Sequence, residues 1–236
     1  MTELAAALGT DPDGATLVSL QPMADDREAI LAAGVPEARL VSGMISFIAY
    51  AAPLEGEARF PRPGMAYWFP PLSPSPFSGP DARTRAVVAL LTRGGLPARR
   101  HRDVPSAVGF PSVIGMAYLT ALEAVDWSLR ALRASSELAL AARAGREAIA
   151  IVERTWGPPA PIARLGMAFA VRPVLVKLAL WFAERVMPLP LEAYLRTHFT
   201  KVGEQTRLIV SSVIADGRAA ALPVRELEAL AATVPS

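Results

Sequence analysis

The chain has 236 residues, of which 52% are hydrophobic and 19% charged, a composition that excludes a disordered protein. Lysine and arginine total 24 and the acids 22, so the net charge of +2 lacks the basic excess expected of a nucleic-acid binder. Cysteine is absent and histidine occurs only as His101 and His198, which excludes disulfides and predicts no metal site.

Strand and helix patterns alternate in the first part of the chain. We predict the end of a helix at 1–8, a buried strand at 15–20, a helix at 25–33 and a long apolar strand at 39–51. Strand, helix and strand in this order form a βαβ crossover, the unit of a parallel sheet. No basic segment precedes an apolar run at the N-terminus, so we expect no signal peptide and a cytoplasmic protein.

Proline dominates the next stretch, with eight of the chain's 22 prolines between Pro53 and Pro80. These prolines predict a loop or hairpin region in which 64–69 is the only strand. A helix is predicted at 81–91, and the last strand of the sheet at 98–102.

The periodicity is helical from residue 104 onward. The predicted fold class is therefore α/β plus all-α. A partial Rossmann-like parallel sheet occupies residues 1–103 and a mainly helical domain occupies residues 104–236. Such a sheet has an exposed edge, and because unpaired backbone groups recruit partners, we expect a homo-oligomer.

Two long apolar stretches raise the question of a membrane. Residues 104–122 carry no charge, but Pro105, Pro111 and Gly115 interrupt them, so a buried helix is favoured over a membrane span. Residues 161–183 carry three cations that share no single helical face. A core helix whose cations reach solvent is favoured there, and a helix lying at a membrane surface is the alternative.

The run Arg99-Arg100-His101-Arg102 forms a basic cluster at the end of a predicted strand. Strand ends in α/β sheets commonly bind phosphorylated ligands. Charges on an edge strand also prevent edge-to-edge aggregation, and we favour this second interpretation.

A polar stripe is the sharpest local pattern in the sequence. On a single helix predicted over 191–215, helical spacing places five polar side chains on one narrow face: Tyr194, His198, Lys201, Gln205 and Ser212. Apolar residues occupy the adjoining face, so the stripe lies at the margin of the core. It is either a hydrogen-bonded seam against a neighbouring helix, which we favour, or the edge of a ligand site.

Several segments, taken in their order along the chain, match the pattern of a known family. The strand Thr16-Leu17-Val18-Ser19-Leu20-Gln21 is similar to a family strand that ends in Leu-Gln-Asn-Gly. A second strand lies around 41–49, a helix ends in Gly94-Gly95, and Asp103 opens the domain junction. The run His198-Phe199-Thr200-Lys201-Val202-Gly203-Glu204-Gln205 is similar to His-Phe-x-Lys-Val-x-x-Gln. Over nearly its full length the chain thus resembles the ketopantoate reductase family and its divergent paralogues.

The resemblance implies an NADPH-dependent oxidoreductase that reduces a 2-oxo acid, with NADP and substrate held between an α/β domain and a helical domain. The chain has no G-x-G-x-x-G turn, so it resembles a member truncated at the N-terminus. Pro22 follows Gln21 where the family has an asparagine. Alignment from Asp103 puts Pro111 in place of the family's general-acid lysine. The implied activity is therefore impaired or incomplete.

The polar stripe supplies the remaining candidates for chemistry. Lys201 is the candidate proton donor, and His198 is the second catalytic candidate, which orients the substrate or shares the proton. Tyr194, Gln205 and Ser212 are the candidate substrate-binding residues, and no residue is assigned to the cofactor. The alternative function is a non-catalytic binding or dimerisation module derived from the same family.

Overall fold

The computed structural model describes residues 14–20 and 24–234. The predicted end of a helix at 1–8 lies outside these residues. The chain divides into two compact units, one made of residues 1–49 and 67–109 and the other of residues 50–66 and 110–236. The division after residue 103 expected from the sequence therefore falls a little later, and the hairpin segment 50–66 groups with the helices.

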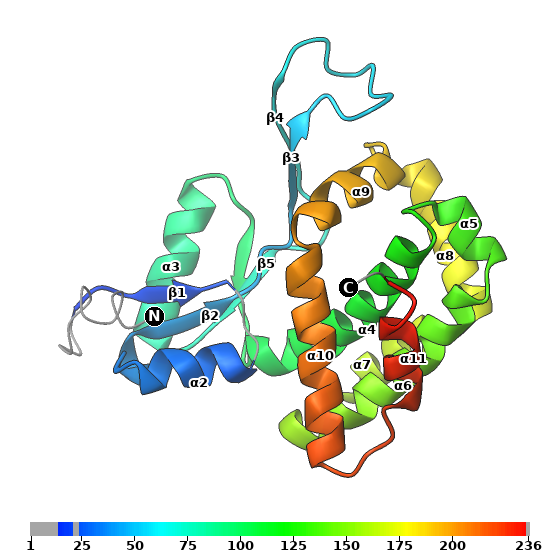
Figure 1. Cartoon of the computed structure of the whole chain (residues 1–236). Coiled ribbons are helices and arrows are strands. Elements are labelled where there is room, and N and C mark those ends of the chain that lie inside the picture. The colour runs from blue at the N-terminus through cyan, green and yellow to red at the C-terminus, as the bar shows by residue number, and fades with distance from the viewer. Residues whose placement is uncertain (1–13, 21–23, 235–236) are drawn as a thin grey trace. The chain divides into compact units, whose positions relative to one another are not determined.

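The first unit contains a four-stranded sheet (Figure 1) in the order β1-β2-β5-β6. These strands are β1 (Leu17–Ser19), β2 (Leu40–Gly43), β5 (Ser75–Ser78) and β6 (Ala98–Arg100). The pairs β1–β2 and β5–β6 are parallel, whereas β2 and β5 are antiparallel. The predicted parallel sheet is therefore wrong in one of its three pairings, and the sheet is mixed.

Helices join the two parallel pairs of strands. The first crossover contains α2 (Ala24–Ala32) and the 3₁₀ turn η1 (Glu37–Arg39), and the second contains α3 (Asp81–Arg93). The side chain of Arg39 is fully buried, and its Nε donates to the carbonyl of Ala15 at 2.7 Å. Both predicted helices of this unit are confirmed, and so is the first βαβ crossover.

The strand predicted over 39–51 is interrupted. Its first part is β2 and its second part is β3 (Ile48–Ala52), which pairs with β4 (Gly64–Trp68) in a separate two-stranded sheet. The intervening residues leave the first sheet, and the backbone N–H of Met44 donates to the carbonyl of Pro76 at 3.1 Å. A continuous apolar run of the sequence thus forms one strand in each of two sheets.

Helices make up the rest of the chain, and no strand occurs between residues 104 and 234. This confirms the predicted order, an α/β part followed by helices. The helices are α4 (Val104–Ala124), α5 (Leu129–Ala134), α6 (Glu137–Trp156), α7 (Pro161–Ala170), α8 (Pro173–Val186), α9 (Leu191–Lys201), α10 (Gly203–Ala219) and α11 (Arg225–Ala231).

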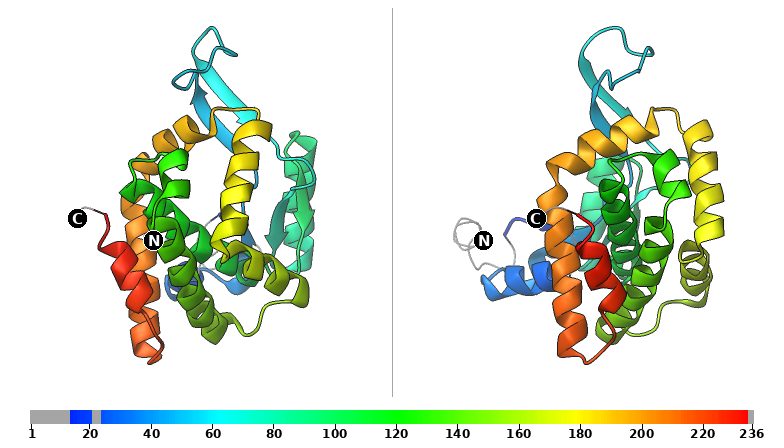
Figure 2. Two further views of the ribbon diagram at one scale, coloured as in Figure 1. Left: turned by 90° about the vertical axis from the view of Figure 1, so that its right-hand side faces the viewer. Right: turned by 45° about the vertical axis from the view of Figure 1, so that its right-hand side comes forward.

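The core of the second unit is built around α6, which packs against α10 and α11 (Figure 2). Small residues on α6 are fully buried and allow close approach of the neighbouring helices: Ala141, Ala142, Ala144 and Ala148. Gly217 of α10 allows the same, since a Cβ there would lie 2.6 Å from Cδ1 of Ile151. The small size of these alanine and glycine residues, together with the packing of large apolar side chains, therefore sets how closely the helices approach.

One helix of the described chain, α4, is long and apolar enough to cross a membrane, and the bent pair 163–170 with 173–186 would add a second if counted as one span. Length and composition alone support these spans, and a buried core helix passes the same test. Ten residues of α4 are buried, among them Val104, Phe110, Val113, Ile114, Ala117, Ala121 and Leu122. α4 thus packs part of its surface into the chain, and the preference for a buried helix over a membrane span stays a prediction.

Candidate functional site

The predicted polar stripe lies on two helices instead of one. α9 ends at Lys201, Val202 takes a non-helical conformation with φ −113° and ψ 17°, and α10 begins at Gly203. Figure 1 shows the two helices running in different directions. The single helix predicted over 191–215 is therefore wrong, and helical spacing no longer aligns Gln205 and Ser212 with the three residues on α9.

Within α9 the local geometry follows the helical prediction. The rings of Tyr194 and His198, one turn apart, are stacked with centroids 5.4 Å apart and planes at 20°. His198 also meets Phe199 edge to face at 4.8 Å, and Phe199 stacks on Trp127 at 6.3 Å. At the other end, Tyr194 lies edge to face with Tyr50 at 6.0 Å. A continuous aromatic row thus holds the imidazole in place.

Tyr50 and Glu57 join this site although sequence reasoning did not select them. The hydroxyl of Tyr50 donates to Oε1 of Glu57 at 2.7 Å, and Oε2 of Glu57 accepts from the backbone N–H of Leu54 at 2.9 Å. Burial first, and this carboxylate second, raise the pKa of Tyr50 to about 12. Tyr50 lies in the strand predicted over 39–51 and Glu57 in the proline-rich segment, and neither prediction points to chemistry.

The electrostatics of the row favour a neutral imidazole. Burial lowers the pKa of His198, and the positive charge of Lys201 lowers it further. Burial also raises the pKa of the Tyr194 hydroxyl. At neutral pH the site therefore presents an uncharged imidazole and an uncharged phenol near one ammonium group. A neutral imidazole can donate one hydrogen bond and accept another, which suits a carbonyl-containing ligand.

His198 itself is exposed and Tyr194 is half-buried, and the other candidate residues are also more open to solvent than the sequence suggested. Lys201 is exposed at the end of α9, so it does not border the core as expected. Gln205 is exposed on α10 and Ser212 is half-buried further along that helix. The structure thus brings Tyr194, His198 and Lys201 together on the last two turns of α9.

The family's lysine position is structurally closed to acid–base chemistry. Pro111 lies inside α4, directly after Phe110, whose side chain is buried in the core. A proline offers no proton, so Pro111 itself cannot act as a general acid. This geometry leaves α9 as the described element with the greatest collection of candidate groups.

A cavity of about 390 Å³ lies in the first unit, and none of the five stripe residues lines it. Its polar lining is largely paired, because Arg27 forms an ion pair with Glu37 and Oγ of Ser78 accepts from the backbone N–H of Val104 at 2.9 Å. Arg102 also lines it. The cavity therefore has few polar groups left for a ligand.

The basic cluster at 99–102 lies along an edge strand and does not line a common binding site. β6 is an edge strand of the described sheet, as the favoured interpretation predicted, and Arg99 and Arg100 are exposed. Arg100 forms an ion pair with Asp81, and the backbone N–H of His101 donates to the carbonyl of Phe77 at 2.7 Å. This arrangement fits a solvated edge strand.

The described residues do not supply a phosphate cradle for a dinucleotide. The turn from β5 into α3 contains Gly79, but a Cβ there would lie 2.6 Å from the carbonyl oxygen of Leu40, so backbone fills this space. Asp81 in the first turn of α3 would also repel a phosphate. The turn from β5 into α3 therefore offers no phosphate cradle, and no group of three or more potential metal ligands occurs among the described residues.

Comparison with models of protein families, with curated proteins and with solved structures found no match to this chain.

Proposed function

We propose that this chain is a divergent ketopantoate-reductase-like protein that binds a small 2-oxo acid at the end of α9, with hydride transfer from NADPH impaired. The order of elements supports the Rossmann-like relationship: a βαβ crossover, a hairpin, the strand β5, a helix, an edge strand and then helices. The observation that carries the ligand site is the stacked pair Tyr194 and His198 next to Lys201.

The three residues divide the recognition of a 2-oxo acid between them. The ammonium group of Lys201 pairs with the carboxylate of the ligand, which needs a lasting positive charge. The imidazole of His198, kept neutral by burial and by Lys201, donates a hydrogen bond to the 2-oxo group. Tyr194 fixes the plane of the imidazole by stacking. Gln205 and Ser212 on α10 remain proposed contacts to the far end of the ligand.

A proton for reduction of the carbonyl would come from Lys201 or through His198, because Pro111 offers none. The impaired step is binding of the dinucleotide. Without a glycine turn at a helix N-terminus, the pyrophosphate lacks the backbone donors that bind it in dinucleotide enzymes. We therefore expect the full chain to bind the oxo acid and to oxidise NADPH slowly or not at all.

The test is an NMR titration of the imidazole protons with 2-oxoisovalerate as the probe. We expect the signals of His198 to move in the parent protein and to stay fixed in Lys201→Met, which keeps the stem and removes the charge. Lys177→Met is the matched control, because Lys177 is the only other lysine of the chain. Equal shifts of the His198 signals in the two variants, or no shift in the parent, would rule out the proposed ligand site. If NADPH oxidation is detected, Lys201→Met should reduce it by about 100-fold or more.

Pro111 favours a second candidate function, a non-catalytic binding or dimerisation module. A proline inside α4 is compatible with a purely structural helix. In this case the chain associates with itself, and the 2-oxo acid has no effect on His198. Analytical ultracentrifugation over a range of concentrations distinguishes the two, because the module requires a concentration-dependent dimer.

A further inference from the structure

The outer side of α8 is an apolar surface without a packing partner among the described residues. None of its residues is buried, so the core helix predicted over 161–183 is wrong for this part. Large side chains recur at helical spacing along one side of α8, here named the α8 face: Val174, Leu178, Trp181, Phe182 and Val186. Five large exposed apolar side chains on one side of a helix mark an interaction site.

The opposite side of α8 holds the helix on its unit. Val176 and Leu180 pack against the core of the helical unit, so the α8 face is turned away from that core. α7 continues the apolar surface after a bend of 91°, with Leu165 and Phe169 exposed one turn apart. α8 is therefore apolar on both sides, with one side packed on the core and the other exposed.

Positive charges outnumber negative ones around the α8 face. Residues 157–183 contain three cations, Arg164, Arg172 and Lys177, and no acid. Lys177 is exposed, and no ion pair joins it to another described residue. The guanidinium of Arg185 lies 3.8 Å from the centroid of the Trp181 ring, and its Nη1 donates to the carbonyl of Trp181 at 2.7 Å. A cation thus lies directly on the apolar surface.

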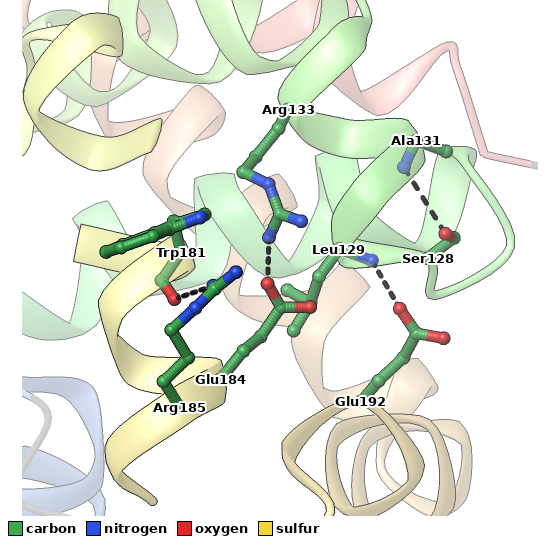
Figure 3. A network of polar contacts seen from close by, with 8 residues as sticks. All are labelled: Ser128, Leu129, Ala131, Arg133, Trp181, Glu184, Arg185 and Glu192. Atoms are coloured by element: carbon green, nitrogen blue, oxygen red, sulfur yellow. Dashed lines mark hydrogen bonds and ion pairs between the residues drawn. The ribbon is translucent and has the colours of Figure 1, made fainter. Parts of the chain in front are cut away.

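The one acid on α8 is neutralised. Figure 3 shows Glu184 in an ion pair with Arg133 of α5, and 27% of the Glu184 side chain is exposed. Glu192, at the start of α9, is likewise occupied, because its Oε2 accepts from the backbone N–H of Leu129 at 2.7 Å. The α8 face therefore presents apolar side chains and positive charge together.

We propose that the α8 face binds the surface of a membrane rich in anionic phospholipids, with α8 lying along the interface. The exposed apolar side chains enter the boundary of the acyl chains, and Trp181 takes the interfacial position that indole rings prefer. Lys177 and Arg185 reach the negatively charged headgroups. The inference is independent of the proposed ligand site on α9.

Charge complementarity favours this occupant over a second copy of the chain. A twofold interface would bring the same cationic surface against itself, with no acid of the α8 face to neutralise it. An anionic membrane supplies the opposite charge over a wide area. Self-association through α8 is therefore the outcome that would contradict the proposal.

The experiment is flotation of the full chain with vesicles of phosphatidylcholine and phosphatidylglycerol in equal parts. We expect the parent protein to float with these vesicles and to float much less with vesicles of phosphatidylcholine alone. Leu178→Ser should lower the partition coefficient by about 10-fold, because a large apolar side chain leaves the interface. Lys177→Gln should lower it by about fivefold, and only for the anionic vesicles.

Leu90→Ser is the matched control, because Leu90 on α3 is 63% exposed and Leu178 is 60% exposed. This variant should float like the parent protein. Both leucines are at the surface, so loss of folding does not explain a difference between them. Equal flotation of the two serine variants, no flotation of the parent, or a dimer in solution that Leu178→Ser dissociates would each overturn the proposal.

Discussion

Gly43 lies opposite Phe77 across the antiparallel pair β2–β5, and the ring of Phe77 occupies the space where a Cβ of Gly43 would be. Phe77 is fully buried, so its ring cannot move toward solvent. The close approach of a glycine backbone to an aromatic ring thus fixes the register of the two strands at the centre of the sheet.

The first prediction concerns this pair. Gly43→Ala should lower the free energy of unfolding of the first unit by about 1–3 kcal/mol, because the new methyl group overlaps the Phe77 ring. Urea denaturation followed by circular dichroism measures the change. Gly64→Ala on β4 is the control, since a Cβ there meets nothing within 4 Å. Equal stability of the two variants would show that the ring can give way.

β5 is the strand that sequence reasoning missed, and Pro76 is the reason. Proline lacks an N–H and is rare in central strands, so the segment was expected to be a loop. The strand persists because its neighbours supply the bonds: the N–H of Ser75 donates to the carbonyl of Pro97 at 2.8 Å, and the carbonyl of Phe77 accepts from His101 at 2.7 Å. The missed strand is also why the sheet is mixed and not parallel.

The candidate site was predictable within α9 and not beyond it. Spacing of one turn placed Tyr194 and His198 together, and the structure stacks them. The extrapolation to Gln205 and Ser212 failed because it ran through Gly203, which costs about 1 kcal/mol inside a helix. Two basic residues in the last turn of α9, followed by that glycine, are typical of a helix C-terminus. This local signal for a helix end is stronger evidence than a polar stripe for where the helix stops.

The second prediction concerns the anchoring of α11. Oε2 of Glu147 on α6 accepts from the backbone N–H groups of Glu226 and Leu227, each at 2.9 Å, and so caps the first turn of α11. Glu147→Ala should destabilise the helical unit by about 1–2 kcal/mol in urea denaturation. Glu147→Gln, which keeps an acceptor oxygen, should lose less.

Glu153→Ala serves as the control for α11, because Glu153 lies on the same helix and makes only a 3.6 Å ion pair with the exposed Arg164. Its effect should stay below about 1 kcal/mol. A loss in Glu153→Ala as large as that in Glu147→Ala would contradict the capping role.

The third prediction concerns Tyr118, whose hydroxyl donates to the carbonyl of Ala170 at the end of α7 at 2.6 Å. Burial raises the pKa of Tyr118 from 10.0 to about 12, while the charge of Arg146 acts weakly in the opposite direction. A raised pKa in the folded state stabilises the protein below pH 10, and this stabilisation is lost as the pH rises toward 12. Tyr118→Phe should therefore destabilise the protein by about 1 kcal/mol at neutral pH.

The same variant should show a smaller loss of stability than the parent between pH 10 and pH 12. Absorbance titration should lose one phenolate step near pH 12, with the step of Tyr50 remaining. Parallel pH–stability curves for the parent and Tyr118→Phe would contradict the assignment.

The last prediction concerns His198, whose pKa is lowered by burial first and by Lys201 second. The unfolded chain then binds a proton before the folded protein does. His198 therefore contributes its full stability above the ordinary pKa of 6.5, and this contribution is lost as the pH falls through 6.5 toward the folded pKa. An NMR titration should place the imidazole pKa below 6.5, and Lys201→Met should raise it without reaching that value, because burial remains. Lys177→Met should leave it unchanged. If the pKa of His198 is the same in the parent and in Lys201→Met, the charge of Lys201 does not act on His198. Burial alone then explains the neutral imidazole.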